Sequence, residues 1–169
     1  MNKVEIKFAK TRKNAVIPSK RDEDAGFDIY ACYDEDITIL NPHETRMFKT
    51  GLVSAFPAGY VIILFERGST GTRGIGQRSG VIDSGYRGEW LVPITNHNDI
   101  PLIIAKAQLP GELASMVERE EAILYPESKA ICQGILLPVP FAKVSECSME
   151  DVCSIQSERG SGKLGSSGK

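Results

Sequence analysis

The chain has 169 residues, of which 41% are hydrophobic and 25% are charged, and its formal net charge is −2. This length predicts one domain with a core of its own, and the small net charge argues against a nucleic-acid or acidic-membrane partner. No apolar run approaches the ~20 residues that span a bilayer. The N-terminus also lacks the hydrophobic stretch of a signal peptide, so we expect a cytoplasmic protein.

Short β-rich runs recur along the chain and are separated by turn residues. The first, residues 4–8, alternates charged and apolar side chains as a half-buried strand does. Further strands are expected at residues 36–40, 51–56, 60–65, 89–95, 102–107 and 131–139. This spacing, without an alternating strand–helix pattern, predicts an all-β sandwich or barrel.

Residues 80–90 contain a turn between two runs of β-forming residues. Ser84-Gly85 at this position predicts a tight hairpin. The backbone groups of such a hairpin can read the polar edge of a flat ring, while Asp83 and Tyr86 project from its shoulders. Taken alone, the pattern favours an ordinary surface hairpin with a solvated aspartate.

Residues 110–125 differ from the rest, because their apolar side chains recur at helical spacing. These side chains are Leu113, Met116, Val117 and Leu124. We therefore expect a short amphipathic helix. It either packs on the β domain or forms a surface for a partner protein or another subunit.

Two glycine-containing segments are candidate phosphate sites. Arg67 lies in the polar loop 66–74, and its planar guanidinium group can bind phosphate through two hydrogen bonds. The tail, residues 157–169, is a flexible linker by composition. Its Gly-x-Gly-x-x-Gly pattern is not followed by a strand–helix unit, which excludes a dinucleotide fold. Its backbone N–H groups, with Arg159 and Lys163, can still bind phosphate.

Few residues offer metal chemistry. Asp24 and Asp28 flank a small-residue turn and are hard oxygen ligands of the kind that Mg²⁺ prefers. The four cysteines form no Cys-x-x-Cys pair, and only two histidines accompany them, so a zinc site is not expected. Gln133 is a polar residue in an apolar strand and needs a hydrogen-bond partner there.

Five segments, in this order, resemble the trimeric deoxyuridine triphosphatase (dUTPase) family. They are residues 24–29, 66–71, 80–90, 131–139 and 159–168. The resemblance implies a jelly-roll-like β-barrel over residues 1–156, one short helix inserted at about 108–127, and a mobile arm at 157–169. It also implies a homotrimer with shared active sites.

The activity implied is the Mg²⁺-dependent hydrolysis of dUTP to dUMP and pyrophosphate, which limits uracil in DNA and supplies dUMP for dTTP synthesis. By resemblance, Asp83 activates the water that attacks the α-phosphate, Arg67 and Gln133 assist, and Asp28 holds Mg²⁺ through water. Tyr86 excludes ribonucleotides. The substrate-binding residues implied are Arg67, Gly68, Ser69, Gly80, Val81, Ile82, Asp83, Tyr86, Gln133, Arg159, Gly162, Lys163, Leu164, Gly165, Ser166 and Ser167.

The sequence departs from the family pattern at several positions. Gly68 stands where the family usually has serine, and Leu164 stands where an aromatic residue stacks on uracil. Ala130 stands where arginine is common. Two alternatives stay open: a dCTP deaminase-type enzyme, alone or bifunctional, and a binding or regulatory protein that acts through residues 108–127.

Overall fold

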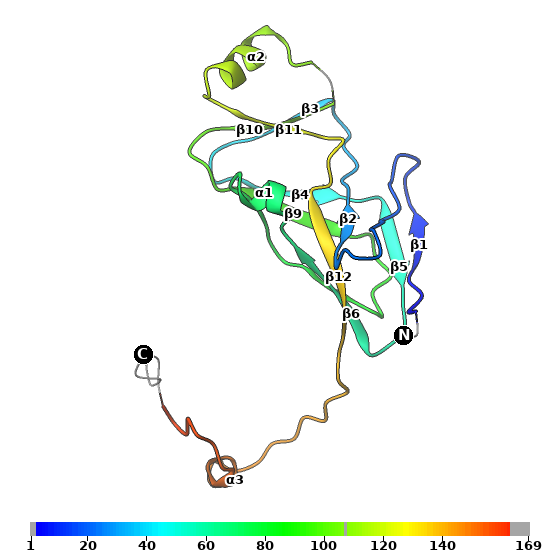
Figure 1. Cartoon of the computed structure of the whole chain (residues 1–169), viewed down its shortest axis with the longest axis vertical. Coiled ribbons are helices and arrows are strands. Elements are labelled where there is room, and N and C mark those ends of the chain that lie inside the picture. The colour runs from blue at the N-terminus through cyan, green and yellow to red at the C-terminus, as the bar shows by residue number, and fades with distance from the viewer. Residues whose placement is uncertain (1–2, 107, 163–169) are drawn as a thin grey trace. The chain divides into compact units, whose positions relative to one another are not determined.

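The computed structural model describes residues 3–106 and 108–162, and its contacts divide the chain into two compact units. The first unit is Met1–Val139 and the second is Pro140–Lys169. The division falls after Val139, earlier than residue 156, because the last apolar strand ends there. Figure 1 shows that the first unit is built mainly from strands, so the predicted all-β class is confirmed.

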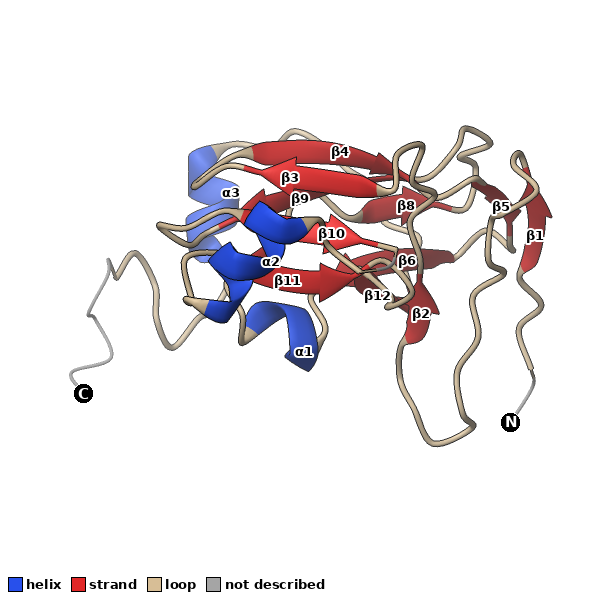
Figure 2. Ribbon diagram, turned by 90° about the horizontal axis from the view of Figure 1, so that it is seen from above, coloured by secondary structure: helices blue, strands red, loops and turns tan. Residues whose placement is uncertain are grey.

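The strands of the described residues form four small sheets (Figures 1 and 2). Their members, in sheet order, are β1 (Lys7–Lys10) and β5 (Leu52–Ala55); β11 (Ile123–Pro126), β10 (Leu102–Ala105) and β3 (Ile37–Leu40); β2 (Phe27–Ile29), β12 (Cys132–Pro138), β6 (Tyr60–Phe65) and β8 (Val81–Asp83); and β4 (Thr45–Lys49), β9 (Leu91–Asn96) and β7 (Ile75–Gln77).

The four-stranded sheet has a register that alternates buried and outward residues. Strand β12 pairs antiparallel with β2 and β6, so that Gln133 lies opposite Asp28 on one side and Phe65 on the other. Strand β8 pairs with the other edge of β6, with Asp83 opposite Val61. Because side chains of paired residues share a face, Asp28, Gln133 and Asp83 all lie on the outer face of this sheet.

The inner faces of the strands meet in one apolar core. Trp90 is fully buried in it, packs edge-on against Phe8 with ring centroids 5.3 Å apart, and donates its indole N–H to Ser54 Oγ at 3.1 Å. The buried Asn96 side chain donates to the carbonyls of Leu40, Asn41 and Ile100. These bonds satisfy the indole N–H of Trp90 and the side-chain amide of Asn96.

The predicted inserted helix is present as α2 (Gly111–Glu118). It packs on the three-stranded sheet through Leu113, Met116 and Val117, over Ile103. Leu124 was expected in the helix but lies in β11, because the helix ends when Glu120 adopts a φ of 59°. Strands β10 and β11 run parallel, so α2 is the crossover that a parallel pair requires.

Two further short helices were not predicted: α1 (Gly68–Gly71) and α3 (Met149–Ser154). Helix α3 lies in the second unit and begins at a capping box, in which Ser148 Oγ accepts from Asp151 N at 3.0 Å. The large apolar side chains of this unit are exposed. The unit therefore has no core of its own among its described residues.

Within residues 3–106 and 108–162, no helix has the length and apolar character needed to cross a membrane.

The contact between α2 and its sheet predicts the effect of truncating Ile103, which is fully buried. Ile103→Ala should lower the free energy of unfolding by about 2–5 kcal/mol, because it removes buried methyl groups and leaves a cavity. Urea denaturation at fixed protein concentration measures this loss. Val144→Ala, at a side chain that is 93% exposed, is the control and should change the value by less than about 0.5 kcal/mol. An equal effect of both substitutions would contradict the packing described.

Candidate functional site

A polar cavity of about 870 Å³ lies at one end of the four-stranded sheet. It has the size of a pocket for a small organic ligand. Its lining residues come from the loop before β2, from β2 and β12, and from the start of α1. They are Ser19, Lys20, Arg21, Glu23, Asp24, Ala25, Gly26, Asp28, Arg67, Gly68, Ser69 and Gln133.

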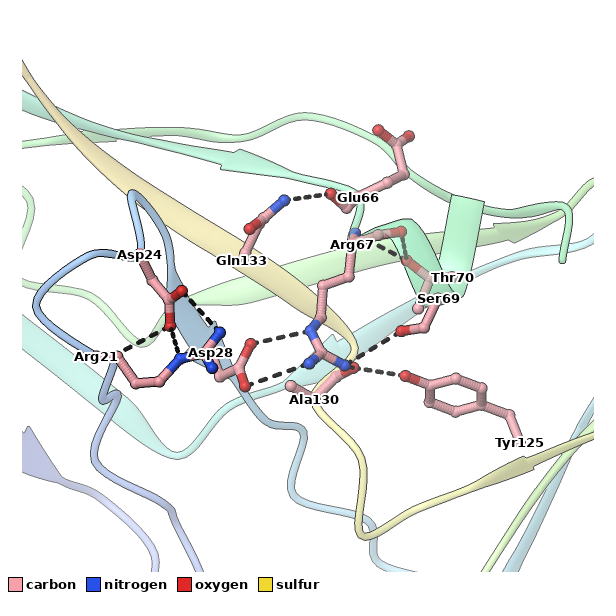
Figure 3. Close-up of polar contacts among 10 residues, drawn as sticks. All are labelled: Arg21, Asp24, Asp28, Glu66, Arg67, Ser69, Thr70, Tyr125, Ala130 and Gln133. Atoms are coloured by element: carbon pink, nitrogen blue, oxygen red, sulfur yellow. Dashed lines mark hydrogen bonds and ion pairs between the residues drawn. The ribbon is translucent and has the colours of Figure 1, made fainter. Parts of the chain in front are cut away.

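Arg67 is held in this cavity by an ion pair with Asp28 (Figure 3). Its Nε lies 2.9 Å from Asp28 Oδ1 and its Nη2 lies 3.3 Å from Asp28 Oδ2, so the guanidinium group binds the carboxylate through two atoms. Its Nη1 also donates to the carbonyl of Ala130 at 3.4 Å and to Ser69 Oγ at 3.3 Å. The same Ala130 carbonyl accepts from Tyr125 Oη at 2.6 Å. Both partners of the ion pair are partly exposed, so the guanidinium is fixed in place yet open to an anion.

Gln133 lies beside this pair because β12 places it opposite Asp28. Its Nε2 donates to the carbonyl of Glu66 at 2.8 Å (Figure 3), which gives the amide the partner that its position requires. Glycine at residue 26 leaves room for the Gln133 side chain, because a Cβ there would lie 2.6 Å from Gln133 Oε1. The neighbouring Cys132 is buried, and burial raises the pKa of its thiol to about 12. Cys132 is therefore inert at neutral pH.

Gly68 and Ser69 form the first turn of α1. A Cβ at Gly68 would meet no atom within 4 Å, so the serine usual in the resembled family would fit there. The guanidinium group of Arg67 donates to the hydroxyl of Ser69. The cavity hydroxyl that contacts Arg67 thus belongs to residue 69, one position after the serine of the family pattern.

The residues expected to read a base line a second cavity of about 190 Å³. They are Gly80, Val81, Ile82, Asp83 and Tyr86, and Ser79 and Leu91 complete the lining. Here Asp83 and Tyr86 lie close together, with Tyr86 N donating to the Asp83 carbonyl at 3.0 Å.

The predicted hairpin at 80–90 is wrong in its pairing. Strand β8 pairs with β6, and the chain after the turn enters β9, which pairs with β4 and β7. The turn explains this, because neither Ser84 nor Gly85 has a positive φ. The two-residue hairpin turns that match strand twist need a positive φ at one or both positions. Arg87 instead closes the turn by donating to the carbonyls of Ser84 and Tyr86.

The backbone directly before β8 is strained at Ser79, which has a φ of 54°. The side-chain amide of Gln77 donates to the carbonyls of Arg78 and Ser79 and supports this conformation. A Cβ at residue 80 would lie 2.8 Å from the carbonyl oxygen of Leu64, which is too close for any side chain. Glycine at residue 80 therefore lets β8 start against β6.

The two cavities are separate places on one subunit. Gln133 is opposite Phe65, whereas Asp83 is opposite Val61, four residues away along β6. At a rise of about 3.3 Å per residue, this is ~13 Å along the strand before the lateral offset is added. Asp83 therefore does not reach the Asp28–Arg67 pair of its own chain.

The expected tail residues are described only in part. Arg159 and Gly162 lie in the second unit, where Arg159 Nε donates to the Gly162 carbonyl at 3.1 Å. The remaining ones, Lys163, Leu164, Gly165, Ser166 and Ser167, lie outside the described residues. What the tail does at the site stays a prediction.

Sequence reasoning missed the loop 19–24 as a wall of the larger cavity. Lys20, Arg21 and Glu23 line it beside Asp24, whose carboxylate binds the guanidinium group of Arg21 at 2.9 Å (Figure 3). This hydrogen bond lowers the pKa of the Asp24 carboxyl. The sequence feature that could have indicated this wall is the run of five charged residues at 20–24. In the described parts of the chain, no group of three or more metal-ligating side chains occurs.

Comparisons with known proteins agree with this fold. The dUTPase family model matches residues 12–109. The deoxyuridine 5'-triphosphate nucleotidohydrolase of Gloeobacter violaceus is 31% identical over 148 residues, which cover 86% of this chain and 83% of the relative. A dUTPase of Staphylococcus bacteriophage 80alpha, solved with dUPNHPP, has a TM-score of 0.75 at 23% identity and covers 98% of this chain and 99% of its own.

A mutant dUTPase from phage phi11 of S. aureus has a TM-score of 0.63 at 20% identity, covering 85% of this chain and 96% of its own. That structure describes the coordination of a structural Mg(II) ion. Fold and sequence thus define one class, an all-β domain with a polar cavity on one sheet. The chain belongs to the dUTPase family.

The contact between Gly26 and Gln133 gives a test of the larger cavity. Gly26→Ala should displace the Gln133 side chain and lower the free energy of unfolding by about 1–3 kcal/mol, since the added methyl group has no room. Gly85→Ala is the matched control, because a Cβ there meets nothing within 4 Å. Denaturation curves, with the side-chain amide NMR signals of Gln133, measure both effects. A harmless Gly26→Ala with an unshifted Gln133 amide would contradict the geometry.

Proposed function

We propose that this protein is a dUTP diphosphatase that hydrolyses dUTP to dUMP and pyrophosphate, and so limits uracil in DNA and supplies dUMP for dTTP synthesis. The observation that carries the proposal is the Asp28–Arg67–Gln133 cluster, in a chain of the dUTPase family. Family membership also favours this activity over deamination of dCTP.

Arg67 and Gln133 would bind the triphosphate. The guanidinium group already makes a two-atom contact with a carboxylate, the geometry in which it also binds phosphate oxygens. The Gln133 amide, held by the Glu66 carbonyl, would donate to a phosphate oxygen or orient the attacking water. Ser69 would supply the hydroxyl that Gly68 lacks.

Asp83 would act as the general base. Its carboxylate is exposed at the end of β8, beside Tyr86 and the backbone of residues 80–82. Water deprotonated by Asp83 would attack the α-phosphorus and release pyrophosphate. The backbone groups would pair with the uracil edge and reject cytosine, because an unmatched buried polar edge costs affinity. Tyr86 would lie against the deoxyribose and leave no room for a 2′-hydroxyl group.

The residues present fit Mg²⁺ that arrives with the nucleotide. Mg²⁺ in phosphate sites is commonly held by one or two carboxylates together with substrate phosphates and waters, and Asp28 supplies such a carboxylate in the larger cavity. Asp28 would hold the ion through water. When bound, the ion would neutralise phosphate charge. Arg67 would then pair with phosphate in place of Asp28.

A homotrimer with shared sites would bring the two cavities together. The outer face of the four-stranded sheet supports association, because it carries exposed apolar side chains: Phe65 (41% exposed), Val81 (65%) and Leu137 (40%). Paired positions Val61 and Ile63 continue this apolar strip between Gln133 and Asp83. Exposed apolar strips of this kind mark subunit contacts. One subunit would give Asp28, Arg67 and Gln133, a second Asp83 and Tyr86, and a third the tail with Arg159 and residues 162–167.

A separate binding function at residues 108–127 has less support. The apolar side chains of α2 pack on its own sheet, so a protein partner would have to bind the polar outer side of the helix. Glu112, Glu118 and Arg119 offer charges for such a contact. A pull-down that compares the protein with and without residues 108–127 would test this second role.

Replacing the proposed base gives a direct test. Asp83→Asn should fold and assemble like the wild type but turn over dUTP at least about 100-fold more slowly, since it loses proton abstraction. Pyrophosphate release measures turnover, and sedimentation measures assembly. Asp99→Asn, an exposed residue that pairs with His43 outside both cavities, is the control. Near-normal turnover by Asp83→Asn would remove Asp83 from the base role.

Mixing two inactive variants tests whether sites are shared. Asp83→Asn and Arg67→Ala subunits should each be inactive alone, whereas mixed trimers should contain some sites with both wild-type groups. We expect activity to return after equal amounts of the two variants are unfolded and refolded together. If each site takes Arg67 from one subunit and Asp83 from another, random assembly should restore about a quarter of the wild-type activity, because each of the two residues is wild type in half of the subunits. No recovery in verified mixed trimers would place Arg67 and Asp83 of a site on the same subunit.

A further inference from the structure

Lys20 is a cation of the larger cavity that forms no ion pair with the described residues. The cavity is lined by three cations and three carboxylates. Arg21 pairs with Asp24, and Arg67 pairs with Asp28. Among the described residues, no carboxylate lies within ion-pair distance of Lys20, and Glu23 is exposed without an ion pair. The lining is therefore neutral overall, and Lys20 is the cation among these described residues that no ion pair occupies.

The position of the Lys20 ammonium group is fixed by the turn that follows it. Its Nζ donates to the carbonyl of Asp24 at 2.7 Å and to that of Arg21 at 3.2 Å, and it lies 5.7 Å from the centre of the Phe27 ring. The turn itself is closed by the hydrogen bond from Asp24 N to the Arg21 carbonyl and by the Arg21–Asp24 ion pair. Because an ammonium group has three N–H donors, one donor stays available after the two backbone bonds.

The turn is also attached to the rest of the site. Asp28 N donates to the Ser19 carbonyl at 3.0 Å, so the residue before Lys20 is bound to the strand that carries Asp28. Figure 3 shows Arg21 and Asp24 on the opposite side of Asp28 from Arg67. The Lys20 ammonium group is bonded to the carbonyls of Arg21 and Asp24, so it belongs to their side of the cavity, whereas Arg67 lines the cavity from the start of α1. A chain of several phosphates can bridge these two sides, whereas a single phosphate cannot contact both as readily.

We propose that Lys20 is a substrate-positioning residue that binds the polyphosphate chain of the nucleotide from the side of the cavity that carries Arg21 and Asp24. This inference rests on the proposed function and extends it, because it assigns recognition of chain length to a residue outside the five family segments. Lys20 touches phosphate away from the attacked bond. Its loss should therefore weaken capture of the triphosphate more than it slows the chemical step.

The test compares Lys20→Gln, Lys20→Arg and wild type, with Lys13→Gln as the matched control. Lys13 is an exposed lysine that does not line this cavity. Lys20→Gln should raise KM for dUTP about tenfold, as expected for one charge-assisted hydrogen bond in an open site, with a smaller change in kcat. Affinity for dUMP should change less than about threefold. Lys20→Arg should recover part of the loss, and Lys13→Gln should match wild type.

Two results would overturn the proposal. One is an unchanged KM in Lys20→Gln. The other is an equal loss for dUTP and dUMP, which would mean that the substitution only disturbs the loop. Calorimetry with inorganic tripolyphosphate separates this proposal from the parent one. If wild type fails to hydrolyse dUTP, the proposed function fails, whereas Lys20 is still judged by whether Lys20→Gln weakens tripolyphosphate binding.

Discussion

Strand β12 pairs with β2 on one side and with β6 on the other, and the arrangement of the larger cavity depends on this antiparallel register. The register places Gln133 opposite Asp28 on one side and opposite Phe65 on the other. Phe65 directly precedes the loop that carries Arg67. A slip of one residue would turn Gln133 into the core and remove it from the Asp28–Arg67 pair, because strand side chains alternate between faces. Buried Cys132 and outward Gln133 fix that alternation.

The same sheet separates the two cavities within one chain. Strand β6 runs from the larger cavity to the smaller one, so it separates Gln133 from Asp83 by the length of the strand. The apolar side chains between them face outward, where only another surface can cover them. Under the proposed function, the exposed apolar side chains and the separation of the two cavities both support association of copies. Residues that catalyse together would then be far apart in one chain but adjacent in the assembly.

The sequence predicted the strands that have continuous apolar runs, and it did so most accurately for β6, whose bounds match. It missed β4, because Thr45–Lys49 mixes charged and apolar residues without a clear period, and β11, because Leu124 also fits a helical spacing. The hairpin predicted at 80–90 is wrong because Ser84 and Gly85 are residue types common in hairpin turns, whereas neither adopts the positive φ that such a turn needs. The pairing of β8 with β6 joins segments that are separated in the chain, so no local sequence pattern indicates it.

The candidate site was recognised largely by resemblance to a family. Periodicity alone gave no reason to place Asp28, Arg67 and Gln133 together, although the structure does so through one ion pair and one strand register. Lys20 was overlooked because a lysine in a charged run is usually a solvated residue. Its role depends on the turn 21–24 that orients its ammonium group, and this turn is visible only in three dimensions.

The central claim, a dUTP-specific diphosphatase, is tested most directly by measuring pyrophosphate release from dUTP, dTTP, dCTP and UTP, each with and without Mg²⁺. Ammonia release from dCTP is measured in the same samples. The account predicts strong, Mg²⁺-dependent release from dUTP alone and no ammonia. Ammonia from dCTP, or no pyrophosphate from any nucleotide by the folded assembly, would contradict it.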